Sequence, residues 1–191
     1  MEILDLKLNK TKNKIMTTTT LITDWDSLVK ESEMVALVAH KNHLYDIFPY
    51  EKHFRDVVNI LEKFGYINEF KCAGFLHDVI EDANLTYSKI KRVFGEKVAE
   101  MVLAVTDPID VRNRKEKKII VYEKLKKNKD AIIIKLADRI ANTQHSLRMD
   151  NRDKISMYEK EYADFRYNLK FENHAEEMWA YLDEIMKFKK I

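Results

Sequence analysis

Residues 71–82 read Lys-Cys-Ala-Gly-Phe-Leu-His-Asp-Val-Ile-Glu-Asp, so an imidazole and three carboxylates fall within six consecutive positions. The apolar run that leads into them predicts a helix over residues 69–82. Positions four apart share a face of a helix, which places His77 beside Glu81 and Asp78 beside Asp82. Like charges at this spacing repel, whereas a bound cation would be complemented by imidazole and carboxylate ligands. The pattern therefore favours a metal site, and an exposed acidic helix end is the alternative.

Two further segments contain residues of the same chemistry. His53 opens an amphipathic segment that is predicted to be a helix over residues 53–64. Asp138 and Arg139 follow the strongly apolar run of residues 131–137. Charged side chains within apolar sequence are rarely buried without a partner. We therefore expect His53 and Asp138 to lie close to the motif at residues 77–82.

This arrangement resembles that of the HD-domain metal-dependent phosphohydrolases, in which a His, an adjacent His-Asp and a distant Asp form the metal site. Here these residues are His53, His77, Asp78 and Asp138. The variant His-Asp-x-x-Glu-Asp, followed by Lys-Leu-Ala-Asp-Arg, is similar to the hydrolase domain of the RelA/SpoT alarmone enzymes and their small single-domain relatives. The resemblance covers residues 40–147 and implies an all-α, HD-domain orthogonal helical bundle.

The resemblance also implies roles for individual residues. His53, His77, Asp78 and Asp138 would be the metal ligands. A set of two nitrogen and two oxygen donors favours Mn²⁺, with Fe²⁺, Mg²⁺ and Zn²⁺ as alternatives. Glu81 and Asp82 would be the catalytic pair, which orients or deprotonates the attacking water and assists the leaving group. The resemblance further implies that Asn142 contacts the nucleotide.

A basic segment from Val111 to Lys129 carries nine Lys and Arg residues against two Glu. Phosphoryl transfer requires positive charge around the phosphate oxygens. Arg114, Lys115 and Lys118 are therefore the predicted phosphate-binding residues. A nucleic-acid surface and a solvated helix face are the alternatives. The chain as a whole has a net charge of only +2, which argues against a nucleic-acid partner.

Composition limits the class of protein. Three Gly and two Pro in 191 residues disfavour loop-rich and all-β folds. One cysteine, Cys72, cannot form an internal disulfide, and neither a signal peptide nor a long apolar span is present. These features predict a cytoplasmic protein without membrane contact. We expect a flexible tail over residues 1–20 and a single domain over residues 21–191.

The hydrophobic period and the capping residues predict the other helices. One begins at the capping sequence of residues 23–26. Later helices are expected at 86–94, 96–105, 130–149, 155–169 and 173–187, and the basic segment is expected to be partly loop and partly helix. His40 and His43 are interpreted as structural or rim residues, and His145 and His174 as surface residues.

Part of the sequence departs from the family pattern. The alarmone hydrolases carry an Arg-Lys pair before the first His ligand, whereas this chain has Lys41 and no such pair. The predicted function is a metal-dependent phosphohydrolase acting on a small nucleotide, with guanosine 3′,5′-bis(diphosphate) 3′-pyrophosphohydrolase activity as the first candidate. The alternatives are a nucleotidase or NADPH phosphatase of the same fold, and a nucleic-acid-binding helical module that uses residues 111–129.

Overall fold

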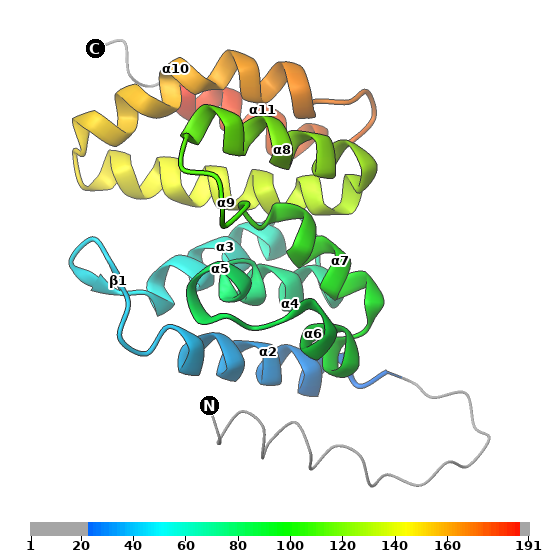
Figure 1. Cartoon of the computed structure of the whole chain (residues 1–191). Coiled ribbons are helices and arrows are strands. Elements are labelled where there is room, and N and C mark those ends of the chain that lie inside the picture. The colour runs from blue at the N-terminus through cyan, green and yellow to red at the C-terminus, as the bar shows by residue number, and fades with distance from the viewer. Residues whose placement is uncertain (1–22, 188–191) are drawn as a thin grey trace, which may run out of the picture.

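The computed structural model describes residues 23–187 and is built almost entirely from helices (Figure 1). The first half contains α2 Trp25–Ala39, α3 Glu51–Lys63, α4 Glu69–Leu76, α5 Val79–Ala83, α6 Tyr87–Phe94 and α7 Glu96–Val105. The second half contains α8 Arg114–Lys127, α9 Lys129–Arg148, α10 Arg152–Leu169 and α11 Glu176–Lys187. The all-α prediction is confirmed. The predicted flexible tail, residues 1–20, lies outside the described residues, and the single-domain assignment stays a prediction.

Polar residues that precede the helices explain several helix starts. The Asp24 carboxylate accepts a hydrogen bond from the Ser27 amide at 3.1 Å, as the capping sequence predicts. Thr86 caps α6 in the same way, and Gly95, with φ of 89°, separates α6 from α7. Asn113 and Asn128 cap α8 and α9. Such a cap satisfies amide groups that have no partner within the helix.

Helix α9 is the central element of the fold (Figure 1). It packs against α3, α4 and α7 on one side and against α8, α10 and α11 on the other. The side chains of Ile132, Ile134, Leu136 and Ile140 are fully buried. Burying one such side chain contributes about 1.5–3 kcal/mol. The remaining polar face of α9 carries Lys135, Asp138 and Asn142, whose spacing aligns them along one side of the helix.

The helix predicted over residues 69–82 is broken, which corrects the sequence-based expectation. Helix α4 ends at Leu76, and the short helix α5 begins at Val79, so His77 and Asp78 lie in the turn between them. The break directs the two side chains toward the centre of the molecule rather than along one helix face. Gly74 lets α4 approach α3 closely, because a Cβ atom there would lie 2.7 Å from Leu61 Cδ1.

A short hairpin precedes α3 and was not predicted. Its strands are β1 Leu44–Tyr45 and β2 Phe48–Pro49, which pair antiparallel with Tyr45 opposite Phe48. Asp46 takes a φ of 55° in the connecting turn, a conformation that Asp tolerates better than most residues. No helix within residues 23–187 has the length and apolar character needed to span a bilayer.

Candidate metal centre and adjoining cavity

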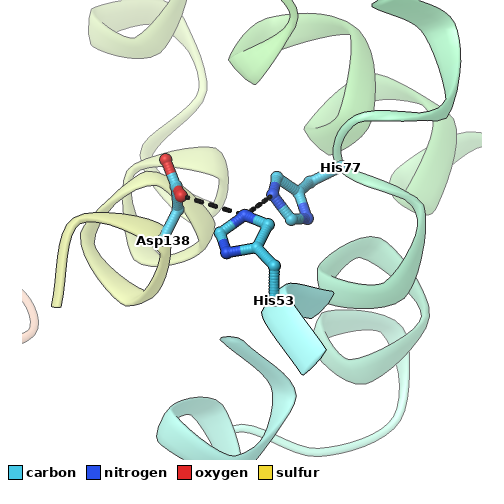
Figure 2. A group of neighbouring side chains, drawn as sticks. All are labelled: His53, His77 and Asp138. Carbon is cyan, nitrogen blue, oxygen red and sulfur yellow. Dashed lines mark hydrogen bonds and ion pairs between the residues drawn. The ribbon is translucent and has the colours of Figure 1, made fainter. Parts of the chain in front are cut away.

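Four predicted ligands converge between α3, α4 and α9. His53 lies in the first turn of α3, His77 follows α4, and Asp138 projects from α9 (Figure 2). Asp78 is the residue after His77. His53 Nε2 lies 3.1 Å from His77 Nε2 and 3.5 Å from Asp138 Oδ1. Asp78 Oδ2 lies 2.9 Å from His77 Nε2 and 3.6 Å from His53 Nε2. Donor atoms of His53, His77 and Asp138 all lie within 4.8 Å of one another, so one ion could contact these three, with Asp78 beside the two imidazoles.

The two imidazole rings are oriented by contacts outside this cluster. His77 Nδ1 lies 2.7 Å from the Gly74 carbonyl oxygen, which can only accept, so Nδ1 is the protonated nitrogen of the neutral ring. The lone pair of His77 Nε2 is then available to a metal, in the arrangement that metal-bound histidines commonly show. The His53 ring packs at 4.7 Å from the Tyr45 ring, and its buried Nδ1 has no hydrogen-bond partner within residues 23–187.

The electrostatics of the cluster favour a cation. Burial alone would lower the pKa of His77, but the carboxylate of Asp78 raises it to about 9. Burial would raise the pKa of Asp78, yet His77 and His53 hold it well below its usual range. Burial likewise opposes ionisation of Asp138, and Lys135, 3.4 Å away, keeps the pKa of that carboxyl low. Donor types, burial and charge thus fit a divalent ion.

Two further carboxylates lie on α5, directly after the cluster. The Glu81 carboxylate accepts a hydrogen bond from the Asp107 amide at the end of α7. Displacement of water by surrounding protein raises the pKa of Glu81, and the charge of Asp78 adds to this effect. Asp82 Oδ2 lies 3.4 Å from Nε2 of His40, which is buried at the end of α2. A raised pKa suits a carboxylate that accepts a proton near neutral pH.

A cavity of about 180 Å³ adjoins the cluster, and Asp138 and Asn142 form part of its wall. Its other polar walls are mostly cationic. The basic lining residues are Arg114, Lys117 and Lys118 from α8, and Lys135 and Arg139 from α9. Cationic side chains around a small cavity complement an anion such as phosphate.

One carboxylate organises most of these cations. Glu161 of α10 accepts hydrogen bonds from Arg114 Nε at 2.8 Å and from Arg139 Nη2 at 3.1 Å, and it also pairs with Lys118. Burial opposes ionisation, but the three cations lower the pKa of Glu161 to about 2. The Arg139 guanidinium also lies 4.7 Å from the centre of the Tyr158 ring. Three like charges are thus held together by a single anion.

The hairpin closes another side of the cluster. The Tyr45 hydroxyl donates to Asn142 Oδ1 at 2.6 Å, and the Asn142 amide donates to Asp138. Both ends of the Asn142 side chain are therefore in use. The turn of the hairpin is fixed by Asp46, which lies 2.7 Å from His145 Nε2 and 2.8 Å from Lys154 Nζ.

The structure brings together most of the residues that the sequence singles out. His53, His77, Asp78 and Asp138 form the cluster, and their role as ligands stays a prediction. Arg114, Lys118 and Asn142 line the cavity, whereas Lys115 is exposed and does not; Lys117 lines it instead. The interpretation of His145 as a surface residue is wrong, because it is 1% exposed and pairs with Asp46.

Several residues of the site were not identified from the sequence. Tyr50 and Lys135 each precede a predicted ligand by three positions on the same helical stretch, and this spacing is a signal that could have indicated both. Tyr50 donates to Asp78 Oδ2 at 2.6 Å. His40, Tyr45 and Glu161 lie far in the sequence from the residues that they contact, which are Asp82, Asn142 and Arg114, and no local pattern identifies them.

A comparison with protein-family models matches residues 33–164 to the HD domain family. The Escherichia coli K12 bifunctional (p)ppGpp synthase/hydrolase SpoT is 35% identical over 137 residues, which cover 67% of this chain and 20% of that protein. This chain therefore aligns with only about a fifth of the length of the first bacterial relatives. The Drosophila melanogaster guanosine-3′,5′-bis(diphosphate) 3′-pyrophosphohydrolase MESH1 is 29% identical, with coverage of 73% of this chain and 80% of that protein.

A solved structure gives a match over nearly the full length of both chains. It belongs to a metazoan orthologue of SpoT that hydrolyses ppGpp and plays a role in starvation responses. The TM-score is 0.72 at 25% sequence identity, and the match covers 92% of this chain and 99% of the other. The fold therefore agrees with that of the HD-domain relatives beyond the segment matched in sequence.

Proposed function

Because the chain belongs to the HD-domain family, we propose that it is a divalent-metal-dependent hydrolase of a phosphate or pyrophosphate ester on a nucleotide. The first substrate candidate is guanosine 3′,5′-bis(diphosphate), cleaved at its 3′-pyrophosphate, because relatives with this named activity match over most of the chain. The observation that carries the proposal is the cluster of two buried imidazoles and the Asp138 carboxylate, with Asp78 beside them, next to a cation-lined cavity.

His53, His77, Asp78 and Asp138 would hold the ion. We favour Mn²⁺ because the donors are two nitrogens and two oxygens, and Fe²⁺, Mg²⁺ and Zn²⁺ suit the same set. A divalent ion bound there lowers the pKa of water and withdraws charge from a phosphoryl oxygen. The hydrogen bonds that fix the His77 ring keep its Nε2 directed at this position.

Glu81 and Asp82 would carry the proton transfers. Glu81, with its raised pKa and its hydrogen bond to the Asp107 amide, is placed to accept a proton from the attacking water. Asp82 would assist the leaving oxygen. Hydrolysis of the 3′-pyrophosphate ester would consume one water and yield a free 3′-hydroxyl and pyrophosphate.

The cavity would hold phosphate oxygens of the substrate. Arg114, Lys117 and Lys118 project into it from α8, and Lys135 lies between the cavity and the metal cluster. Asn142 lies at the junction, where a rotation away from Tyr45 would free its carbonyl oxygen, Oδ1, for the nucleotide. We no longer place Lys115 in this group, because it lies outside the cavity lining.

The pairing of the basic residues argues against a nucleic-acid surface. Arg114 and Lys118 are bound to Glu161, Lys117 lies 3.6 Å from Asp107, and Lys126 pairs with Glu123. Cations that are already neutralised release fewer counterions on binding a polyanion, and they add less to its affinity.

A panel of nucleotides tests the proposal. Chelator-treated protein is assayed for phosphate and pyrophosphate release from ppGpp, nucleoside monophosphates and NADPH, with and without Mn²⁺. We expect Mn²⁺-dependent release of pyrophosphate from ppGpp and none from Asp138→Asn. Orthophosphate release from a monophosphate or from NADPH would support the proposed hydrolase activity but would replace ppGpp as the substrate candidate. An absence of hydrolysis with Mn²⁺, and also with Fe²⁺, Mg²⁺ and Zn²⁺, would refute the proposed activity.

A further inference from the structure

His40 connects the end of α2 to the proposed catalytic pair. Its side chain is 1% exposed, and its Nε2 lies 3.4 Å from Asp82 Oδ2. This nitrogen is buried and forms no hydrogen bond within residues 23–187, and the Asp82 carboxylate lies at ion-pair distance from it. A buried polar atom without a partner is costly, so the contact with Asp82 is the one that accounts for its position.

The contact made by the other ring nitrogen, Nδ1, determines the tautomer of the His40 ring. His40 Nδ1 lies 2.9 Å from the Ala36 carbonyl oxygen, an acceptor only, so Nδ1 carries a hydrogen. A neutral ring in this tautomer would direct the bare lone pair of Nε2 at the Asp82 carboxylate. Two acceptors at 3.4 Å repel each other. With Nδ1 already protonated, a second proton on Nε2 would turn this repulsion into attraction to the Asp82 carboxylate.

The His40 ring is also fixed relative to the metal cluster. It stacks on the Tyr50 ring at a centroid distance of 4.5 Å and an interplanar angle of 11°. The Tyr50 hydroxyl donates to Asp78 Oδ2 at 2.6 Å. The stacked pair thus connects Asp82 with a carboxylate of the cluster through contacts that leave little freedom to either ring.

We propose that His40 is a positioning residue for Asp82, acting through the ion-pair contact between a proton-bearing Nε2 and the Asp82 carboxylate. This inference rests on the proposed function, in which Asp82 assists the leaving group. The Asp82 side chain is 36% exposed, so without this contact it would be free to turn toward water. Loss of His40 should therefore lower kcat while leaving KM nearly unchanged, because His40 does not line the cavity that holds the phosphates.

Two substitutions at this position separate positioning from simple packing. In His40→Gln, the side-chain amide reaches about as far as Nε2 and can still donate to Asp82. In His40→Asn, the shorter amide can still donate to the Ala36 carbonyl but cannot reach Asp82. We expect His40→Asn to lower kcat about 10- to 100-fold, the usual effect of losing an outer partner of a catalytic group. His40→Gln should recover most of that loss.

The neighbouring His43 provides the matched control. It is exposed and contacts the His40 ring edge-on at 5.5 Å, so His43→Ala removes a nearby imidazole without touching Asp82. Its kcat should equal that of the wild type. In an Asp82→Asn background, His40→Asn should add no further loss, because the group on which His40 acts is already changed.

A nuclear magnetic resonance measurement tests for the proton on His40 Nε2 without any assay of hydrolysis. In metal-free wild-type protein near neutral pH, the ¹⁵N shifts of the His40 ring should report that both nitrogens are protonated. In Asp82→Asn, Nε2 should lose its proton. An unprotonated Nε2 in the wild type, or a kcat for His40→Gln as low as that of His40→Asn, would overturn the inference. If the wild type hydrolyses no nucleotide, the proposed function fails, and the nitrogen shifts still decide the role of His40.

Discussion

The metal cluster and the cation-lined cavity share helix α9 but are built with opposite charge balances. In the cluster, Asp78 and Asp138 are partly buried beside two buried imidazoles, and Lys135 lies 3.4 Å from Asp138. Around the cavity, five cationic side chains outnumber the carboxylates of Asp107, Asp138 and the neighbouring Glu161. In the cluster, carboxylates adjoin imidazoles that can bind a metal. A bound cation would complete the cluster, and a phosphate group would complete the cavity.

The charge difference implies that substitutions in the two regions should have different effects. Glu81→Gln next to the cluster should reduce kcat by about 100-fold or more, the scale for losing a general base. Glutamine keeps an acceptor for the Asp107 amide, so the loop should hold its position and the bound metal should be retained. Turnover and metal content are measured on the same sample. Glu100→Gln, an exposed substitution on α7, is the control.

Loss of metal in Glu81→Gln would make Glu81 a ligand rather than a base. Unchanged turnover would remove it from the reaction altogether.

A substitution in the cavity should affect substrate affinity rather than metal content. Arg114→Ala should lower kcat/KM by an amount that corresponds to about 1–3 kcal/mol of lost transition-state stabilisation, the scale of a charge-assisted hydrogen bond. The loss should be larger for substrates with two linked phosphates than for monophosphates. Arg112→Ala, exposed and outside the cavity lining, serves as the matched control.

The same variant distinguishes the cavity from a nucleic-acid surface. Normal hydrolysis of small nucleotides by Arg114→Ala, together with a shallower salt dependence of RNA or DNA binding, would support the nucleic-acid alternative. If Arg114→Ala hydrolyses nucleotides normally and the wild type does not bind nucleic acid, the basic segment would be a solvated helix face.

Removal of the anion that holds the cavity together should reduce stability. Glu161→Gln leaves three neighbouring cations without a counter-charge, and we expect a loss of about 1–3 kcal/mol in the free energy of unfolding at pH 7. Because the pKa of Glu161 is depressed from 4.5 to about 2, its contribution is fully present above pH 4.5 and is lost as the pH falls toward 2.

Denaturant unfolding at several pH values measures this effect. The difference between wild type and Glu161→Gln should shrink below pH 4.5, while the exposed substitution Glu172→Gln should show almost no difference at any pH. A constant difference from pH 7 to pH 3 would mean that the carboxylate charge is not what stabilises the cavity.

The sequence predicts the fold and the metal cluster better than it predicts the cavity. Capping residues such as Asp24 and Thr86 act on their own helices, so a local pattern is enough to locate those elements. The break at His77 and Asp78 has no local signal, because no Gly or Pro stands there and both residues keep right-handed helical dihedral angles.

Other parts of the site depend on contacts across long sequence separations. Glu161 is one of many charged residues on an amphipathic helix, and only the fold brings it to Arg114 and Arg139. Tyr45 lies in a hairpin of two-residue strands, which is too short for an alternating pattern to show. Its contact with Asn142 depends on how that hairpin rests on α9.

Metal binding by the two regions tests the central claim most directly. Chelator-treated wild type, His77→Ala, Asp138→Asn and Arg114→Ala are titrated with Mn²⁺ by calorimetry, and circular dichroism checks that each variant is folded. We predict about one equivalent of bound Mn²⁺ in the wild type and in Arg114→Ala, and none in the two cluster variants. Equal binding by all four proteins would contradict the account, because the buried cluster would then not be the cation site.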